Sequence, residues 1–531
     1  MFSLGGGSIY RLLNKNIKEF NKVKLSIICV IFLLSVGFIS YKINSSYALF
    51  SDSITGEKTI EATVKLKNLD ISGVNEPELD EGMIPVYYDE STETWRKASS
   101  SNSNEKYRWY DYDNKMWANS VTVSSTNRSK YLSAENGTEI PMDDILTMQV
   151  WIPRYKYKVW NYNNDGTKTS NDQEIEITFE KNKEVTGEIS CSDSISGTDG
   201  SASETCKLKS TNTTCTDTTC NNKTYTHPAF TFGDEEIKGF WIGKFELSNN
   251  SNCTATNFSS KGTGCNLNTI TPLTKPELTS WRGAQISTFE EVIMKMNSTG
   301  NQYGIPTSSD THMIKNIEWG AVAYLSHSKY GTCTNGTCTE IGINNNSNYI
   351  TGCGTKVGAS SSTTCNKYNT NSGMLASTTS NIYGVYDMSG GSWEYVMGNM
   401  VYTDKSTMLS GFSLDRNSGY TGKVSYENSS NETTTWPNYS GINYPNTKYI
   451  DKYSYGSNIK KSTKLGEAIK EVQTGTNIGW YSDSNYSLER ARPWFRRGGG
   501  HNGENTSGIF YSGYDYGSAL DGASTRIIII T

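Results

Sequence analysis

Glycine interrupts the last part of the chain at intervals that no helix or long strand tolerates. From Trp494 the sequence reads WFRRGGGHNGENTSGIFYSGYDYGSALDGASTRIIIIT, with glycines at 498, 499, 500, 503, 508, 513, 517 and 522. Glycine raises the entropic cost of regular structure and permits positive φ. The spacing therefore predicts a looped segment that carries aromatic and polar side chains. The β-branched run Ile527–Ile530 predicts a strand at its end.

The residue types in this segment are those of binding loops. Tyrosine, serine, glycine and asparagine dominate antibody paratopes, where rigid rings supply contact area and small polar residues adapt. A loop-rich edge of a fold without a partner is the alternative, and composition alone ranks the two equally. The candidate ligand contacts are His501, Asn502, Glu504, Asn505, Tyr511, Tyr514, Asp515 and Tyr516.

Polar uncharged residues replace apolar ones over the whole chain. Of the 531 residues, 35% are hydrophobic and 19% are charged, yet there are 34 tyrosines and 12 tryptophans. So many aromatic residues argue against disorder, and the polar excess predicts long surface loops around a modest core. The net charge of −5 provides no basic surface, so nucleic acid is not an expected partner.

The long apolar run at residues 25–41 indicates export. It follows several lysines and an arginine, and its length is at the lower limit for a membrane span. The basic side should stay in the cytoplasm, so the bulk of the chain lies outside. Ser46 and Ala48 are small residues at the positions that a signal peptidase reads. Residues 1–48 are thus either a signal peptide or a membrane anchor, and the protein is expected to be secreted or displayed at the cell surface.

Ten cysteines beyond this segment fall in sequential couples, which predicts local disulfides. Zinc binding by two couples is the alternative. However, the spacers are polar, no histidine is adjacent, and an exported chain meets an oxidising compartment. The predicted pairs are Cys191 with Cys206, Cys215 with Cys220, Cys253 with Cys265, Cys333 with Cys338, and Cys353 with Cys365.

The chain beyond the export segment divides into two parts by pattern. Residues 49–139 form an aromatic-rich β leader region, and residues 140–531 form the main domain. Long polar insertions interrupt the main domain near 181–226, 331–375 and 402–478.

Periodicity predicts the main elements of this domain. Alternating residues predict strands at 148–160 and 239–248, the second of them half-buried. A helix is expected in 287–298 with a Ser287–Glu290 capping box, and another in 310–331 capped by Asp310. His312 and His327 are expected to be exposed or hydrogen-bonded residues of the second helix rather than catalysts.

One motif carries a family resemblance. Residues 381–399, NIYGVYDMSGGSWEYVMGN, resemble the N-x-x-G-L-x-D-M-x-G-N-V-W-E-W motif of the formylglycine-generating enzyme, or sulfatase-modifying-factor, family. Further segments resemble other pieces of that family in the same order: GFWIGKFELS, WRGAQISTFEEVIMKM, GIPTSSDTHMIKNIEWGAVAYL, FRRGGGHN and ASTRIIII. The resemblance implies an α+β, C-type-lectin-like domain from about residue 140 to the end.

The resemblance does not extend to the family's reaction. Its oxidase chemistry requires a pair of cysteines after the R-G-G-S turn, where thiolates bind copper. This chain has no cysteine between Arg496 and Thr531, so we expect the fold without the reaction. The family also uses the acidic residue of the motif for a structural calcium, which makes Glu394 a candidate Ca²⁺ ligand. Gly391 stands where the family has asparagine.

A closer resemblance is to exported bacterial C-type-lectin-like proteins that retroelements diversify. In those proteins the interval between the R-G-G and G-F-R motifs is the binding surface. This favours a non-catalytic, surface-displayed, adhesin- or receptor-like protein that binds through residues 500–521. A protein ligand is preferred over a glycan, because no lectin-type Glu-Pro-Asn triplet is present.

Two alternatives to this function stay open. One is an enzyme of the same fold. The other is a structural matrix or filament subunit, because the start LFSDSITGEKTIEATVKLKNLDIS resembles camelysin-type matrix proteins.

Overall fold

The computed structural model describes residues 68–162, 172–195, 202–250, 270–401, 464–488 and 492–531, with shorter stretches at 418–421, 425–427, 433–435, 442–443 and 445–454. The chain divides into two units, residues 1–68 and 69–531. The expected signal or anchor segment, with its apolar run at 25–41, lies outside the described residues. Within the described ranges, no helix is both long and apolar enough to cross a membrane.

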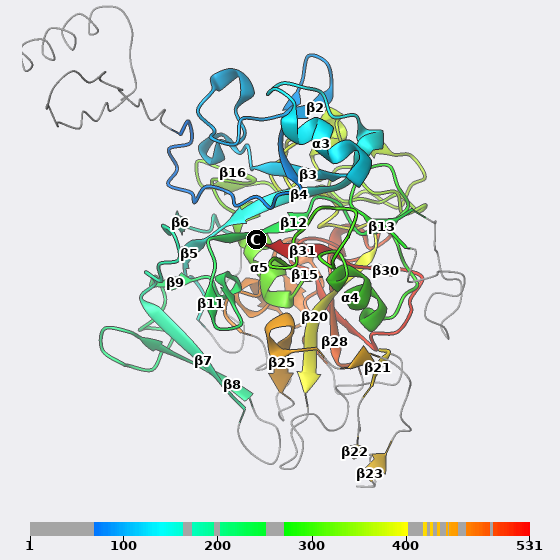
Figure 1. The fold of residues 1–531 in the computed structure, drawn as a ribbon. Helices are drawn as coiled ribbons and strands as arrows, with labels where there is room; N and C mark the ends of the chain where they lie inside the picture. Colours follow the sequence, from blue (N-terminus) through cyan, green and yellow to red (C-terminus); the bar gives the residue numbers. More distant parts are fainter. Residues whose placement is uncertain are drawn as a thin grey trace, which may run out of the picture. The chain divides into compact units, whose positions relative to one another are not determined.

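The second unit is a strand-rich α+β structure organised around a seven-stranded antiparallel sheet (Figure 1). The predicted strand Ile527–Ile530 is confirmed, and it lies inside this sheet rather than at its edge. All four isoleucines are buried, with Ile529 opposite Trp241. The strand order is β15 (Asp310–Met313), β31 (Ile527–Ile530), β12 (Gly239–Gly243), β4 (Ile145–Pro153), β3 (Asn119–Val123), β1 (Met83–Asp89) and β2 (Thr94–Lys97).

Residues 69–139 contribute directly to this sheet. Strands β1, β2 and β3 continue it beyond β4, with Val121 opposite Met148. The tryptophans of the region, such as Trp109 and Trp117, are buried in the shared core. This part of the leader region therefore belongs to the same compact unit as the rest of the chain. One helix, α3 (Ser125–Ser133), follows β3.

A second, five-stranded sheet brings the 381–399 motif beside the C-terminal segment. Strand β20 (Trp393–Val401) pairs antiparallel with β28 (Trp494–Arg497), and a bulge shifts the register between Tyr395 and Asn399. Strand β28 pairs in turn with β29 (Ser512–Asp515). Two further strands run parallel to β20, namely β25 (Asp451–Ser454) and β30 (Ala523–Ser524).

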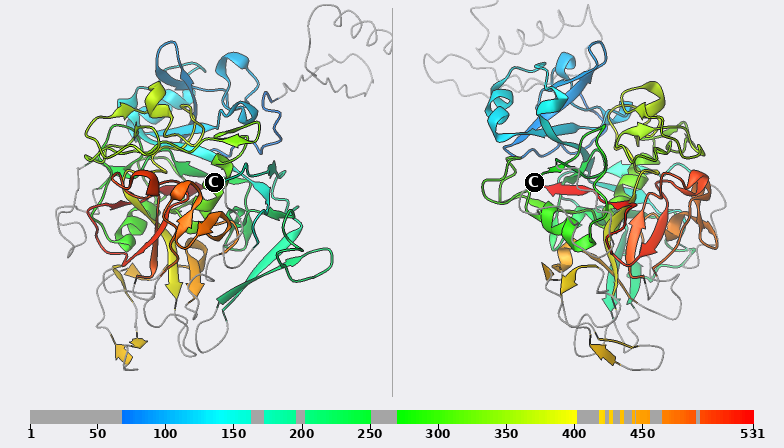
Figure 2. Two further views of the ribbon diagram at one scale, coloured as in Figure 1. Left: turned by 180° about the vertical axis from the view of Figure 1, so that it is seen from behind. Right: turned by 90° about the vertical axis from the view of Figure 1, so that its right-hand side faces the viewer.

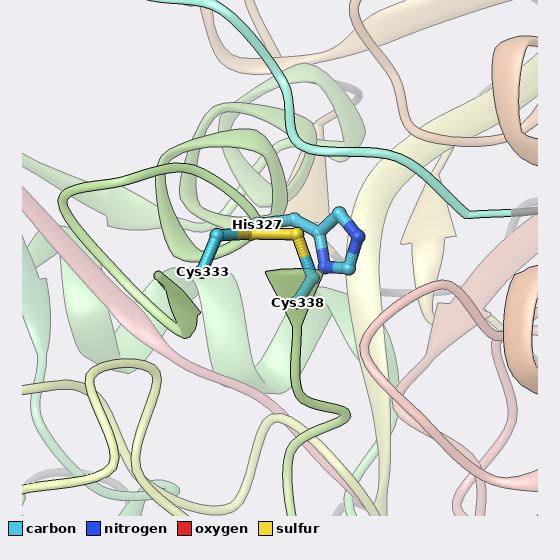
Figure 3. Close-up of side chains that lie close together, drawn as sticks. All are labelled: His327, Cys333 and Cys338. Atoms are coloured by element: carbon cyan, nitrogen blue, oxygen red, sulfur yellow. A yellow bond between two sulfur atoms is a disulfide. The ribbon is translucent and has the colours of Figure 1, made fainter. Parts of the chain in front are cut away.

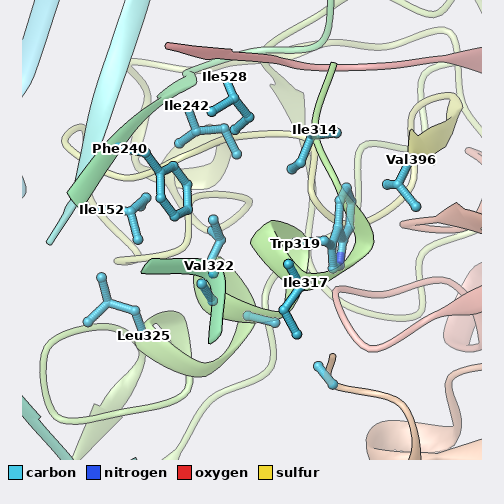
Figure 4. Packing of buried hydrophobic residues seen from close by; sticks show 14 of the residues in the cluster. Ile152, Phe240, Ile242, Ile314, Ile317, Trp319, Val322, Leu325, Val396 and Ile528 are labelled. Carbon is cyan, nitrogen blue, oxygen red and sulfur yellow. The ribbon is translucent and has the colours of Figure 1, made fainter. Parts of the chain in front are cut away.

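Helix α5 (Asn316–Ser326) packs between the two sheets and contacts both β4 and β20. Every residue of the helix is buried. Figure 4 shows Val322 and Leu325 of α5 on the side of Phe240 and Ile152 of the first sheet, with Trp319 beside Ile314 and Ile317. The Trp319 ring lies against Arg497 of β28 in the second sheet. Gly320 lies so close to the loop at Gly466 that a Cβ would be 1.9 Å from the Gly466 carbonyl oxygen. Only glycine allows this approach.

The helix starts differ from the sequence predictions. Asp310 does not cap a helix, because residues 310–313 form β15 against β31. Helix α5 begins after Lys315, whose N–H donates to Glu318 Oε2 at 2.7 Å. Helix α4 (Ile286–Met294) has Gln285 at its N-cap, so the predicted Ser287–Glu290 capping box is also wrong. The Glu290 carboxylate instead accepts a hydrogen bond from the hydroxyl of Tyr420.

The two predicted strands are also modified by packing. The 148–160 strand is divided into β4 and β5 (Tyr155–Lys158) by buried Arg154, which pairs with Glu180 at 3.1 Å. The 239–248 segment is not half-buried, because neighbouring elements cover both of its faces. Lys244 follows β12 and is fully buried; its ammonium donates to Asn119 Oδ1 and to two backbone carbonyls.

The described parts of the first two polar insertions contain short hairpins and turns held by disulfides. Strands β7 (Ile189–Ile195) and β8 (Ala202–Leu208) form a hairpin that projects to one side in Figure 1 and in the left-hand view of Figure 2. The predicted pairs are confirmed as disulfides for Cys191–Cys206, Cys215–Cys220, Cys333–Cys338 and Cys353–Cys365. Cys253 and Cys265 lie outside the described residues.

The remaining described elements are short and form small local sheets. The three-stranded sheet comprises β6 (Ile177–Phe179), β5 and β9 (Thr224–Thr226). The strand pairs are β10 (Thr231–Phe232) with β11 (Glu235–Glu236), β13 (Ser248–Asn249) with β14 (Pro272–Leu273), β16 (Cys333–Thr334) with β17 (Thr337–Cys338), β18 (Cys353–Gly354) with β19 (Asn366–Lys367), β21 (Tyr420–Thr421) with β24 (Ile442–Asn443), β22 (Ser425–Glu427) with β23 (Thr433–Thr435), and β26 (Gln473–Gly475) with β27 (Ile478–Gly479). The four-residue helix α6 (Asn371–Met374) follows β19.

Candidate functional site

The glycine-rich turn after β28 docks onto the motif of β20. The Gly390 N–H donates to the Gly498 carbonyl at 2.9 Å, and the His501 N–H donates to the Gly391 carbonyl at 2.8 Å. At Gly500 a Cβ would lie 3.0 Å from the Trp393 indole, so glycine lets the turn lie against this ring. These contacts fix the position of the residues that follow the turn.

Two stacked arginines and three aromatic rings gather at this turn. The guanidinium carbon of Arg282 lies 3.7 Å from the centre of the Tyr349 ring, and this ring meets His501 edge-on at 4.6 Å. The guanidinium of Arg496 lies over Trp393 at 4.6 Å. Such cation–π pairs hold arginine side chains in defined orientations. We refer to Arg282, Tyr349, Trp393, Arg496 and His501 as the arginine–aromatic cluster.

Most of the cluster is half-buried, with its rings partly accessible from solvent. Tyr349, Trp393, Arg496 and His501 are neither fully buried nor fully exposed, while Arg282 is 7% exposed. Asp521 is exposed and pairs with Arg282 at 3.0 Å. Partly buried, oriented aromatic and arginine side chains are the residue types that dominate binding energy in protein interfaces.

The histidine of the cluster is neutral, and each of its two arginines is paired with an aspartate. Burial and the nearby Arg282 guanidinium lower the pKa of His501 below its ordinary value. The imidazole is therefore uncharged at neutral pH, and the charge of the cluster comes from its two arginines. Asp521 and Asp515 partly offset that charge, because each pairs with one of the arginines.

Four of the predicted contact residues lie beside this cluster. His501 is half-buried, and Asn502, Glu504 and Asn505 are exposed on the turn that continues from it. A short 3₁₀ helix, Glu504–Thr506, ends the turn. His501 thus belongs both to the predicted contacts and to the cluster, and the other three residues follow it on the same turn.

Two of the predicted contacts are structural instead. Tyr511 is 9% exposed, and its carbonyl accepts a hydrogen bond from Arg497 Nε at 2.8 Å. Asp515 is 8% exposed; it pairs with Arg496 at 3.2 Å and accepts a hydrogen bond from the Tyr395 hydroxyl. Neither side chain is available to a ligand, because both are buried.

The last two predicted contacts lie on the other face of the β28–β29 pair. Tyr514 is opposite Phe495, whereas Arg496 is opposite Gly513. Because successive residues of a strand point to opposite faces, Tyr514 and Arg496 lie on different sides. Tyr514 packs against Tyr486 at 5.7 Å. Tyr516 is 42% exposed. The eight predicted residues therefore do not form one surface.

Glu394 does not fit a calcium ligand in this structure. Its Oε1 accepts hydrogen bonds from Arg526 Nε at 3.0 Å and Arg526 Nη2 at 2.7 Å, and both side chains are fully buried. A calcium ion requires six to eight oxygen ligands, and the guanidinium places a positive charge where that ion would bind. Gly391 also has no oxygen-bearing side chain to offer.

A separate cleft of about 1080 Å³ lies near the end of β31 and the start of α5, lined in part by Phe232, Asp310 and Lys448. Asp310 and Lys448, two of its charged groups, are engaged with each other. Asp310 contacts His312 at 3.0 Å and Lys448 at 3.1 Å, which helps to lower the pKa of Asp310 to about 2 although burial opposes this. His312 is buried in β15 between Asp310 and Glu318 and is not a helix residue. We interpret this network as one that stabilises the fold.

Sequence reasoning found His501 and missed the other four members of the cluster. Arg496 directly precedes the fully buried Arg497, so its partial exposure is visible only in the folded chain. Arg282 and Tyr349 come from separate segments that meet only in the folded chain, so no local pattern marks them. Trp393 lies in the 381–399 motif, and its place in that motif is the signal that could have identified it.

No protein-family model matches the chain, and the search of curated proteins gives no significant match.

Proposed function

We propose that this chain is an exported, non-catalytic binding protein, of adhesin or receptor type, whose arginine–aromatic cluster contacts a protein ligand. The observation that carries the proposal is the stacking of Arg282 and Arg496 on Tyr349 and Trp393 beside an exposed turn. Stacking fixes these side chains before a ligand arrives, which reduces the entropy that binding must overcome.

A protein ligand is preferred because of the chemistry of the cluster. Tryptophan, tyrosine and arginine are enriched in interface hot spots. The exposed Asn502, Glu504 and Asn505 provide a polar rim next to them. The absence of a lectin-type Glu-Pro-Asn triplet from the sequence supports the same choice.

The proposed fold is a C-type-lectin-like domain of the sulfatase-modifying-factor type. Support comes from the pairing of β20, which carries the family-like motif, with β28, which begins the family-like R-G-G turn. The lack of cysteine between Arg496 and Thr531 supports a binding rather than an oxidase role. The four disulfides are compatible with secretion or surface display, with residues 1–48 as signal peptide or anchor.

The test is a binding screen of the full chain against arrays of extracellular proteins and of glycans, with and without calcium. We expect a protein hit that does not depend on calcium and that Tyr349→Ser or Arg496→Gln weakens at least tenfold. Tyr514→Ser, on the opposite face of β28–β29, is the matched control and should bind normally.

Three results would contradict the proposal. One is a hit that Tyr514→Ser weakens and Tyr349→Ser does not. Another is copper-dependent peptide oxidation, which would restore the enzyme alternative. The third is filament assembly of the purified chain with no ligand on either array, which would favour the matrix alternative.

A further inference from the structure

A buried histidine lies beside one of the disulfides, in a region that the proposed function does not use. His327 follows α5, and its N–H donates to the Ala323 carbonyl at 3.0 Å. Its side chain is 3% exposed. Figure 3 shows the imidazole next to the Cys333–Cys338 bond. One ring nitrogen and both sulfurs all lie within 4.8 Å of one another.

The two cysteines are held by a short hairpin. Cys333 and Cys338 are directly opposite in the β16–β17 pair, and the turn between them contains Asn335 and Gly336 at positive φ. Opposed residues of a strand pair keep their side chains on the same face whether or not the sulfurs are bonded. The hairpin thus holds both sulfurs near His327 after reduction as well.

The far side of the imidazole is oriented by polar groups. His327 Nε2 lies 3.5 Å from the Tyr481 hydroxyl and 3.8 Å from Asp172 Oδ2, and the Tyr481 hydroxyl donates to that carboxylate at 2.8 Å. Metal-binding histidines are commonly oriented in this way through their second nitrogen. Tyr481 and Ser482 are both at positive φ, a strained conformation that concentrates at functional sites.

The surroundings of His327 favour a cation. Burial lowers the pKa of His327 to about 4, so the imidazole is a neutral ligand at pH 7. Glu340, two residues after Cys338, and Asp483 each have a buried carboxylate oxygen without a hydrogen-bond partner among the described residues. Burial raises the pKa of both carboxyls to about 8, so at neutral pH the negative charge beside the imidazole comes from Asp172.

We propose that Cys333, Cys338 and His327 form a zinc site that opens when their disulfide is reduced. A dithiol gives two electrons to the disulfide and closes to its own disulfide; the Cys333–Cys338 bond breaks and two thiols form. Zn²⁺ then binds both sulfurs, whose two protons pass to solvent, and accepts the lone pair of neutral His327. Zinc bonds of about 2.3 Å to sulfur and about 2.0 Å to nitrogen require that the sulfurs move apart, and a water molecule would take the fourth position of the tetrahedral ion.

The chain contains a matched control for this proposal. Cys215 and Cys220 have the same spacing and also form a disulfide. They belong to neither of the two potential ligand groups found among the described residues. The second of those groups is Cys191, Cys206 and Glu204, but the Glu204 carboxylate already pairs with Lys470 at 3.2 Å and accepts the Leu465 N–H. We therefore assign the site to the 333–338 hairpin alone.

The test is metal protection of cysteines in the full wild-type chain. The protein is reduced with dithiothreitol, freed of reductant under argon, incubated with Zn²⁺ and treated with iodoacetamide. Peptide mass spectrometry then reads the alkylation of each cysteine. We expect Zn²⁺ to slow alkylation of Cys333 and Cys338 at least tenfold and to leave Cys215 and Cys220 unaffected. Equal protection of both pairs, or protection of neither, would overturn the proposal.

A second measurement tests the histidine. With Co²⁺ in place of Zn²⁺, the reduced chain should show a thiolate-to-cobalt charge-transfer band and the intense visible bands of tetrahedral cobalt. The variant His327→Gln should bind Co²⁺ at least tenfold more weakly with the same number of titratable thiols. Cys215→Ser/Cys220→Ser should retain the full spectrum. An unchanged cobalt affinity in His327→Gln would exclude its role.

Discussion

Arg526 Nη2 lies 2.7 Å from Glu394 Oε1, and neither side chain has any exposure to solvent. Arg526 also donates to the carbonyls of Gly243 and Tyr386. The pair thus connects Glu394 of β20, in the second sheet, to the start of β31 in the first sheet. It also connects both to Gly243 of β12 and to Tyr386 of the 381–399 motif. A buried charge pair of this kind contributes mainly when one partner would otherwise be left alone.

Removing the arginine should therefore be costly. We expect Arg526→Met to lower the free energy of unfolding by roughly 3–5 kcal/mol, because Glu394 is then buried near Asp387 without its partner and must either carry an unpaired charge or take up a proton. The double variant Arg526→Met/Glu394→Gln should recover part of that loss. Denaturant unfolding of the three proteins measures this. A loss below about 1 kcal/mol in the single variant would mean that the pair is not a structural connection.

At Gly391 the chain differs from the motif that residues 381–399 resemble, and the structure gives a steric reason. Its φ is 63°, and a Cβ at this position would lie 2.3 Å from Glu246 Oε1. The substitution Gly391→Asn, which introduces the residue of the resembled motif, should therefore lower the free energy of unfolding by roughly 2–4 kcal/mol through overpacking and strain. Gly336→Asn is the control, since Gly336 also has positive φ but nothing lies within 4 Å of the added Cβ. Thermal unfolding should separate the two variants clearly; equal melting temperatures would contradict the steric explanation.

Asp483 should make stability depend on pH. Burial raises its pKa from 3.8 to about 8, so the folded chain retains a proton that the unfolded chain loses. Its contribution is fully present below about pH 4 and is lost as the pH rises through 8, with a slope of up to about 1.4 kcal/mol per pH unit. The isosteric variant Asp483→Asn should flatten the stability profile between pH 5 and 8. The exposed Glu90→Gln serves as control. An unchanged slope in Asp483→Asn would show that this carboxyl does not hold the proton.

The disulfides should differ in their effect on stability according to the length of chain they close. The Cys191–Cys206 bond spans 15 residues and the Cys333–Cys338 bond spans 5. Loop-closure entropy then predicts losses of about 3 and about 2 kcal/mol when each pair is replaced by alanine. Unfolding of the two double variants in the oxidised state measures the difference. A larger loss for the short pair would mean that contacts of this hairpin, rather than loop entropy, determine its stabilising effect.

Local signals in the sequence predicted local structure well. The four isoleucines at 527–530 gave the correct strand, and cysteines close in sequence gave the correct pairs wherever the structure describes them. Helix starts failed because distant residues competed for the same side chains. Asp310 lies in β15 and pairs with Lys448, and the Glu290 carboxylate accepts a hydrogen bond from Tyr420.

The candidate site was predicted in part for a similar reason. The turn at 500–506 is marked by its own glycines and polar residues. In contrast, the stacking of Arg282 on Tyr349 joins segments that have no common period or motif. The burial of Tyr511 and Asp515 follows from the pairing of β28 with β29, which a single-sequence reading could not place.

The interior position of β31 has a consequence for how the chain folds. Its hydrogen bonds to β12 and β15 join parts that are separated by most of the sequence. Non-local pairing of this kind slows folding, because a long loop must close before any contact forms. Strands β12 and β15 cannot be joined in the first sheet until residues 527–530 have been synthesised and form β31 between them. Under the export proposed above, this delay would leave the chain unfolded while it is threaded across a membrane.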